Sequence, residues 1–424
     1  MEEILKINSQ AELFQKLGSE DACVEYLIQL KWGGKPSCSN CSSKERVYYI
    51  KSRQLFKCSE CNKHMSIRKN TLFQNSKLPL RIWFLAIYNL STETINNGYS
   101  ACKAQRDLGV SYKTAWTMLH KIRETMKFEN EGKINGIVEA DEVYCGARLN
   151  RDNKLRYRVY EAQKQRIRWG LETKEEYKSR KKKEAKWNEK FPDYKVEKVE
   201  NELDERLKGL SEYRKRVAKS VDFRESEYKK VHYRKNIVGF LQVDETEEVK
   251  NKKGKIIKKI TKYGKIRLAK VGREKKDICK PTITPLLEKF LTRSTILMTD
   301  GTDIYDEASN IVKKHFKVQH TKKKNEKHKP IKYAYELKNN FGIECFTTNR
   351  IENAWNHFKK MENGTYIHFS WEHTDRYLYE FVFKYNNRGL SIAETFDKII
   401  GATMDTVVSY KALMNSKSQY SYRS

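Results

Sequence analysis

With 424 residues, the chain is long enough for two or three domains and a sizeable core, although only 38% of its residues are hydrophobic. Its 86 Lys and Arg against 55 Asp and Glu give a formal net charge of +31, spread along the chain, which favours a polyanionic partner such as nucleic acid. An anionic membrane surface is less favoured, because no apolar run reaches about 18 residues and no secretion signal opens the sequence. Four of the nine cysteines form two close pairs, so a disulfide framework is not expected and a soluble intracellular protein is.

In chain order, residues 1–34 come first and carry apolar side chains at three- and four-residue steps, which predicts a helical segment. The cysteine pairs follow: Cys38 with Cys41, and Cys58 with Cys61, each with C-x2-C spacing. Each pair can offer two thiolates to one ion, so residues 35–75 are predicted to form a zinc ribbon with a structural Zn²⁺. A redox-active C-x-x-C is the alternative. His64 follows the second pair, but four cysteines already complete a tetrahedral ligand set.

The stretch between the pairs, RVYYIKSRQLFK, alternates polar and aromatic residues as two ribbon strands would. The basic side chains that we expect there to contact DNA are Arg46, Arg53 and Lys57. Such a ribbon stabilises a small fold and is not evidence for catalysis.

Residues 76–130 are predicted to form a helical DNA-binding domain. SACKAQRDLGVSYKTAWTMLHKIRETM has a helical pattern, a break at LGVS where Gly109 turns the chain, and a second helix that Ser111 would cap. This is the pattern of a helix-turn-helix, whose second helix lies in the major groove. The residues expected at the DNA are Ser111, Tyr112, Lys113 and Thr114. An ordinary helical hairpin is the alternative, but the basic context and the neighbouring ribbon favour DNA binding.

Residues 131–147 and 236–400 carry short strand-like runs and then helices, which predicts one α/β domain. Between them, residues 148–235 are dense in Lys, Arg and Glu and nearly free of Gly and Pro, which predicts a charged helical insertion. Disorder is the alternative for so polar a segment. Residues 401–424 would form a C-terminal tail. The predicted fold class is therefore multidomain α+β.

Three acidic residues lie where strands end or where a helix exposes one face. Asp141 lies in the apolar run GIVEADEVYCG, and Asp300 ends STILMTDG, which places its carboxylate at the carboxyl edge of a strand. Glu352 lies in TTNRIENAWNHFKK, a predicted helix that Thr347 or Thr348 would cap.

That helix has one polar and one apolar face. The polar face consists of Asn349, Glu352, Asn356 and Lys359. The packing face consists of Ile351, Ala354, Trp355 and Phe358. Converging carboxylates repel each other in a dry site, and two Mg²⁺ ions with oxygen ligands are the usual compensation. The sequence thus predicts that Asp141, Asp300 and Glu352 hold metal for in-line phosphodiester chemistry.

For each acid taken alone, the alternative is a solvated or salt-bridged carboxylate. Glu139 and Glu142, which flank Asp141, are interpreted in that way. Asp303 and Asp306 are alternatives to Asp300, but both lie beyond the end of the predicted strand.

In this order, the motifs resemble bacterial insertion-sequence transposases that carry an N-terminal zinc ribbon before a DDE catalytic domain. The stretches that carry the resemblance are KLPLRIWFLAIYNL, AQRDLGVSYKTAWTMLHKIRE, VEADEVYCG, TDG, TNRIENAWNHFKK and FVFKYNNR. The resemblance implies an RNase H-like core that cuts DNA at transposon ends and joins the freed 3'-hydroxyls to target DNA, using Mg²⁺ or Mn²⁺.

By this resemblance, Asp141 and Asp300 match the first and second catalytic aspartates of the family. The third ligand is Glu352, with Asn349 as the alternate. Lys359 matches a family lysine that contacts phosphate near the metals.

Two features depart from the family. Thr302 stands where relatives often have a His or another polar residue, and the insertion at residues 148–235 is far larger than the core needs. We expect that insertion to clamp DNA or to mediate assembly.

The predicted function is a DNA transposase that acts on double-stranded DNA in the cytoplasm, associated with the nucleoid. A homodimer or higher assembly is expected, because two transposon ends must be brought together. The alternatives are a catalytically silent DNA-binding regulator derived from a transposase, and a structure-specific nuclease with the same core.

Overall fold

The computed structural model describes residues 6–145, 168–171, 173, 175–176, 179, 235–243, 245–250, 256–272, 277–318, 348–367 and 369–414. The chain divides into two compact units, Met1–Tyr144 with Lys235–Ser424, and Cys145–Arg234. The predicted charged insertion lies almost wholly outside the described residues, as does the end of the predicted tail. Within the described part, no helix is both long and apolar enough to cross a membrane.

The first unit begins with two short helices, α1 (Gln10–Leu17) and α2 (Glu20–Trp32). Ser9 and Ser19 cap them, because each side chain accepts a hydrogen bond from a backbone N–H of the first turn. A small antiparallel sheet follows, with strands β1 (Val47–Ile50), β2 (Leu55–Cys58) and β3 (His64–Met65) in that spatial order. The ribbon strands therefore form where the alternating sequence pattern predicted them.

Three helices come next: α3 (Leu80–Thr92), α4 (Ala101–Leu108) and α5 (Tyr112–Thr125). Gly109 ends α4 with a positive φ of 63°, which glycine adopts without strain. The Ser111 side chain caps α5 by accepting a hydrogen bond from the N–H of Thr114. The predicted helix break and cap are thus present.

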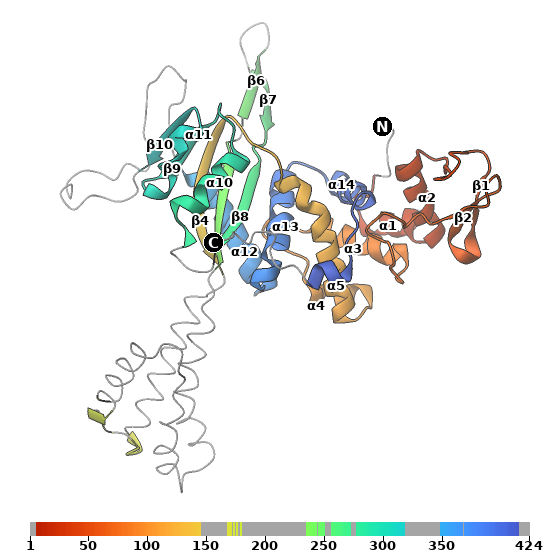
Figure 1. The fold of residues 1–424 in the computed structure, drawn as a ribbon, viewed down its shortest axis with the longest axis horizontal. Coiled ribbons are helices and arrows are strands. Elements are labelled where there is room, and N and C mark those ends of the chain that lie inside the picture. The colour runs from red at the N-terminus through yellow and green to blue at the C-terminus, as the bar shows by residue number, and fades with distance from the viewer. Residues whose placement is uncertain are drawn as a thin grey trace. The chain divides into compact units, whose positions relative to one another are not determined.

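The second sheet has five strands, in the spatial order β10-β9-β4-β5-β8. Their bounds are β4 (Ile137–Cys145), β5 (Lys235–Gln242), β8 (Ile266–Gly272), β9 (Ile296–Asp300) and β10 (Lys314–Val318). β4 and β10 both run parallel to β9, whereas β5 and β8 are antiparallel to each other. β6 (Glu245–Lys250) and β7 (Ile256–Lys262) form a separate antiparallel hairpin that projects from this sheet (Figure 1).

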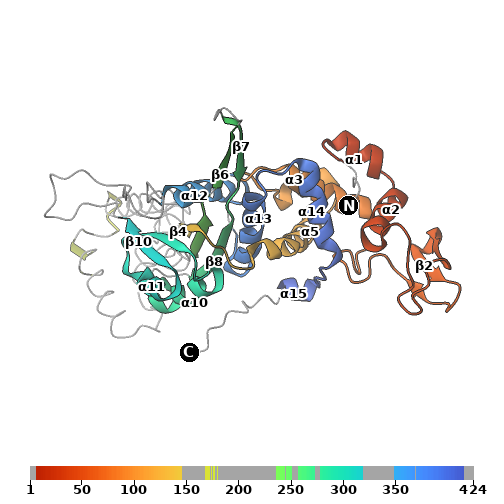
Figure 2. The same cartoon turned by 90° about the horizontal axis from the view of Figure 1, so that it is seen from above.

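Helices cover both faces of the five-stranded sheet, with α10 (Lys280–Phe290) and α11 (Ala308–Ile311) on one side and α12 (Asn349–Met361) on the other (Figure 2). Alternate residues of the strands face the two layers. Val138, Ala140 and Phe240 pack with the buried side chains of α10. On the other face, the Trp355 indole lies against Gly239, where an added Cβ would come within 2.6 Å of the ring.

The C-terminal helices, α13 (Thr374–Asn386) and α14 (Ile392–Met404), share a hydrophobic core with the N-terminal helices and the ribbon. Phe396 of α14 makes an edge-to-face contact with Phe84 of α3, at 6.3 Å between ring centroids. The Tyr26 hydroxyl donates to Asp397 at 2.7 Å. The described N-terminal and C-terminal helices therefore build one core around α3. A short helix, α15 (Tyr410–Met414), ends the described part.

A buried ionic cluster connects α5 to α13, and we call it the paired cluster: Arg123, Tyr366, Glu380 and Lys384. The Glu380 carboxylate is fully buried and accepts hydrogen bonds from Arg123 Nε at 2.7 Å and Lys384 Nζ at 2.7 Å. The Tyr366 hydroxyl donates to the same carboxylate at 2.7 Å. Although burial acts in the opposite sense, the two neighbouring cations lower the pKa of Glu380 to about 2.

Candidate functional site

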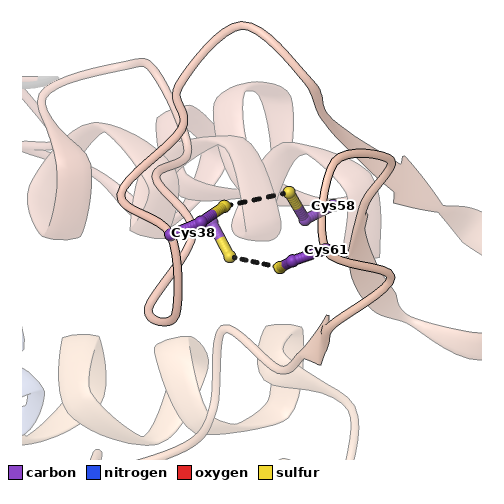
Figure 3. A group of neighbouring side chains, drawn as sticks. Cys38, Cys58 and Cys61 are labelled. Atoms are coloured by element: carbon purple, nitrogen blue, oxygen red, sulfur yellow. Dashed lines mark hydrogen bonds between the residues drawn. The ribbon is translucent and has the colours of Figure 1, made fainter.

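The four paired cysteines converge at the base of the ribbon. Cys38 Sγ lies 3.5 Å from Cys61 Sγ, and Cys41 Sγ lies 3.6 Å from Cys58 Sγ. All four sulfurs lie within 4.8 Å of one another, and Figure 3 shows those of Cys38, Cys58 and Cys61 turned towards a common centre. A tetrahedral zinc with Zn–S bonds of about 2.3 Å has sulfur–sulfur edges of about 3.8 Å, so the cluster fits Zn²⁺.

The thiols of the cluster differ in their pKa values. Backbone N–H groups of Cys41 and Asn40 lower the pKa of Cys38 to about 6, whereas burial and hydrogen bonds to the other cysteines raise the pKa of Cys41 to about 12. His64 is exposed on β3 and is not part of the cluster, as the sequence predicted. The predicted zinc-ribbon ligand set is therefore assembled.

Asp141 and Asp300 lie on neighbouring parallel strands. β4 pairs with β9 in a register that places Glu139 opposite Met298. Two residues further along each strand, the same register sets Asp141 beside Asp300, at the carboxyl end of β9. The two aspartates predicted from separate motifs therefore meet at one edge of the sheet.

Glu352 reaches the same place from the first turn of α12. Burial, together with the carboxylates of Asp300 and Glu352, raises the pKa of Asp141 from 3.8 to about 6. Three acids predicted at separate sequence positions are thus close enough to repel one another. Among the described residues, only the four cysteines bring three or more potential metal ligands within 4.8 Å, so the carboxylates form a looser group.

Each of the three acids is held by a neighbouring side chain. The indole Nε1 of Trp355 donates to Asp141 Oδ2 at 3.0 Å. Thr302 donates to Asp300 Oδ1 through both its hydroxyl, at 2.6 Å, and its backbone N–H, at 3.1 Å. The Thr348 hydroxyl donates to Glu352 Oε1 at 3.1 Å. Thr302, which departs from the family pattern, therefore orients the second aspartate.

Glu139 was interpreted as a solvated or salt-bridged carboxylate, and the salt bridge is present. Its side chain is fully buried and pairs with Arg350 Nη1 at 3.0 Å. Its carboxylate also accepts hydrogen bonds from the backbone N–H groups of Arg350 and Ile351, each at 2.9 Å. Glu139 thus caps α12 from the strand, whereas Thr348 makes no side-chain capping bond to that helix.

Glu142 was also interpreted as solvated or salt-bridged, and this was wrong, because it lies at the acidic site. The Tyr305 hydroxyl, fully buried, donates to Glu142 Oε2 at 3.2 Å. Burial and the nearby carboxylates of Asp300 and Asp141 raise the pKa of Glu142 to about 7. Glu142 is therefore a fourth acid beside the site, on the α10 face of β4, and sequence reasoning missed it.

The remaining predicted residues of the site lie on the exposed face of α12. Asn349, Glu352, Asn356 and Lys359 are exposed, whereas the predicted packing residues of the helix are buried. The alternatives to Asp300 are placed elsewhere. Asp306 pairs with Lys280 at 2.8 Å and with Lys317, and Asp303 has a side chain that is 89% exposed.

The residues predicted to contact DNA at the start of α5 fall into two groups. Ser111 and Thr114 bond to each other, at 2.9 Å between their side-chain oxygens, in the helix cap. Tyr112, 50% exposed, and Lys113 project from the helix, and the Lys113 ammonium lies 5.6 Å from the ring of Tyr410. Tyr112 and Lys113 are thus outward-facing, whereas Ser111, which is also exposed, takes part in the helix cap.

In the ribbon, Arg46 and Arg53 are exposed, whereas Lys57 is half-buried on β2. Lys57 is the cross-strand partner of Tyr48 on one side and of His64 on the other. Arg46 lies just before β1, where its carbonyl oxygen accepts a hydrogen bond from the N–H of Ser59.

Comparison with known proteins matches two parts of the chain to transposase domain families. Residues 18–64 match the transposase zinc-ribbon domain family, and residues 223–386 match the ISXO2-like transposase domain family. The second range contains Asp300 and Glu352, and Asp141 precedes it.

A curated relative is the "Uncharacterized protein in transposable element ISH50" of Halobacterium salinarum, 28% identical over 133 residues. The match covers 31% of this chain and 44% of the relative, so it spans less than half of that protein. No solved structure matches the chain. The two domain matches and this relative confirm the resemblance that the motifs carried: the chain is similar to insertion-sequence transposases with an N-terminal zinc ribbon, and its domains indicate a transposase.

Proposed function

We propose that the protein binds transposon ends, cleaves DNA there and joins the 3'-hydroxyl ends to target DNA. The observation that carries this proposal is the meeting of Asp141, Asp300 and Glu352 at one edge of the sheet. The mixed sheet with helices on both faces supports an RNase H-like core. A regulator that only binds DNA needs no such acids.

The acidic group fits divalent metal by its chemistry. Its ligand atoms are carboxylate oxygens, which Mg²⁺ and Mn²⁺ prefer, and the mutual repulsion at Asp141 favours binding a cation. Metal bound there would activate the attacking hydroxyl and stabilise the leaving oxygen. The protein's own part is to fix the carboxylates, through the bonds from Trp355, Thr302 and Thr348.

The exposed face of α12 provides the contacts to the DNA strand. Lys359 lies on the same face as Glu352, two turns further along the helix, where its ammonium can contact a phosphate beside the metals. Asn349 precedes Glu352 by one turn and is the alternative third ligand. The exposed Tyr112 and Lys113 at the start of α5 are proposed to contact the transposon end.

The test is strand transfer of a labelled transposon-end duplex into plasmid DNA, with Mg²⁺ or Mn²⁺. We expect Asp300→Ala and Glu352→Ala each to reduce joining by roughly 10³-fold, about 4 kcal/mol of transition-state stabilisation, while binding to the end persists. Asp303→Ala is the matched control, because this acid lies near Asp300 but is exposed. Asn349→Ala shows which residue of α12 is the third ligand.

The outcomes separate the alternatives. Cleavage without joining would indicate a nuclease, and tight binding to DNA with neither reaction would indicate a regulator. Equal losses in Asp303→Ala and Asp300→Ala would contradict the assignment of the site.

A further inference from the structure

A basic groove of about 660 Å³ lies beside the ribbon, far along the sequence from the acidic site. Three segments of the chain form it: the start of α2, the turn before β2, and the segment that leads into α3. The residues that line it are Gly18, Ser19, Glu20, Arg53, Gln54, Leu55, Ser66, Arg68, Ser76, Lys77, Pro79 and Arg81. Four of these are basic and one is acidic, so the groove carries a net positive charge.

Arg68 and Glu20 connect the three segments and neutralise each other. Arg68 Nη2 pairs with Glu20 Oε1 at 2.7 Å, and Arg68 Nη1 donates to the carbonyl oxygens of Ser76 and Leu78. Glu20 Oε1 also accepts from the N–H of Leu80, at the start of α3. Because the single acid of the groove is already paired, it does not oppose an anionic ligand.

The other three basic residues are Arg53, Lys77 and Arg81, and all are exposed. Within the described part of the chain, their side chains make no hydrogen bond or ion pair. Arg53 comes from the ribbon, Lys77 from the connecting segment and Arg81 from α3, so folding brings together cations that the sequence separates. Three such charges around an open groove raise the local concentration of a polyanion.

We infer that this groove binds the phosphate backbone of double-stranded DNA, through Arg53, Lys77 and Arg81. The inference rests on the proposed function, since a transposase must hold DNA, and it adds a contact surface outside α5 and the acidic site. DNA is the favoured occupant, because its phosphates repeat along the strand and the whole chain has a net charge of +31. Contacts to phosphate position DNA without reading its sequence.

The experiment measures how binding to a short labelled duplex of arbitrary sequence depends on salt. Full-length wild type is compared with Arg53→Gln/Lys77→Gln/Arg81→Gln, and each protein is checked for zinc content and thermal unfolding. Log K falls with log salt with a slope of about −0.9 for each phosphate contact, so we expect the slope of the triple variant to be less steep by roughly two to three. The single variant Lys77→Gln, which changes only the connecting segment, should have a slope less steep by about one.

The matched control is Lys35→Gln/Lys44→Gln/Lys63→Gln, which removes three exposed ribbon charges that do not line the groove. An unchanged slope in the groove variant, or an equal fall in the control, would overturn the inference. The readout does not need catalysis. Wild type that fails in strand transfer would therefore refute the proposed function, whereas an unchanged slope with intact transfer would refute only the groove.

Discussion

Two groups of buried or half-buried acids lie in the same folded unit and differ in their partners. In the paired cluster, Glu380 is surrounded by Arg123 and Lys384, and its pKa falls to about 2. At the acidic site, burial and then the neighbouring carboxylates raise the pKa values of Asp141 and Glu142 to about 6 and about 7. Acids that pair with buried Arg and Lys side chains hold helices together, whereas acids without such partners favour binding of a metal cation from solution.

The largest effect is expected from breaking the matched group. Glu380→Gln leaves Arg123 and Lys384 buried without a counter-charge, and it should lower the free energy of unfolding by about 3–5 kcal/mol. Urea unfolding checks this. Glu93→Gln is the control, because it breaks an ion pair whose Lys103 is 50% exposed, with an expected cost below about 1 kcal/mol. Similar small losses in both variants would show that the paired cluster adds little.

The second prediction uses the opposite signs of the pKa shifts. Asp141 and Glu142 have raised folded-state pKa values, so between about pH 4 and pH 7 the folded state binds more protons than the unfolded state and stability falls as pH rises. Glu380 behaves in the opposite way: its contribution is present above the unfolded pKa of about 4.5 and is lost as pH falls towards about 2.

At pH 7.5, Asp141→Asn/Glu142→Gln should therefore need more urea to unfold than wild type, because its free energy of unfolding is higher by on the order of 2 kcal/mol. Near pH 4 the two proteins should have similar stability. The measurement needs buffer without Mg²⁺ but with zinc retained in the ribbon. A variant less stable than wild type at pH 7.5 would mean that burial and repulsion do not destabilise the ionised acids.

The smallest expected effect comes from the residue that orients Asp300. Thr302→Val keeps the side-chain shape and removes the hydroxyl that bonds Asp300 at 2.6 Å. Strand transfer should fall by about 10-fold to 100-fold and need more Mg²⁺, as is usual when a bond to a metal ligand is lost. Thr302→Ser should restore most of the rate. If Thr302→Val were fully active, the hydroxyl would not matter to the site.

Local patterns predicted much of what the structure contains. The C-x2-C spacing identified the four cysteines that converge, Gly109 and Ser111 identified the break and cap before α5, and apolar spacing identified the buried face of α12. Each signal arises from residues a few positions apart, because turns, caps and helix faces are set by neighbours in the sequence.

Contacts between distant segments were beyond these patterns. Glu139 bonds to the start of α12 from 211 positions away, and Tyr305 bonds to Glu142 from 163 positions away. No local periodicity encodes such a pairing. Gly239 was a usable signal, since a glycine within a strand often marks the close approach of another group, here the Trp355 indole that bonds Asp141.

The placement of β4 and β5 has a consequence for how this sheet tolerates added sequence. They are neighbours in the sheet, and the N–H of Val243, just after β5, bonds to the carbonyl of Ile137 at the start of β4. The end of β4 therefore lies next to the start of β5, so the chain leaves at Cys145 and returns at Lys235 on adjacent strands. The entropic cost of closing a loop grows only slowly with its length, so long insertions can be accepted between these strands while β4 keeps its register in the sheet.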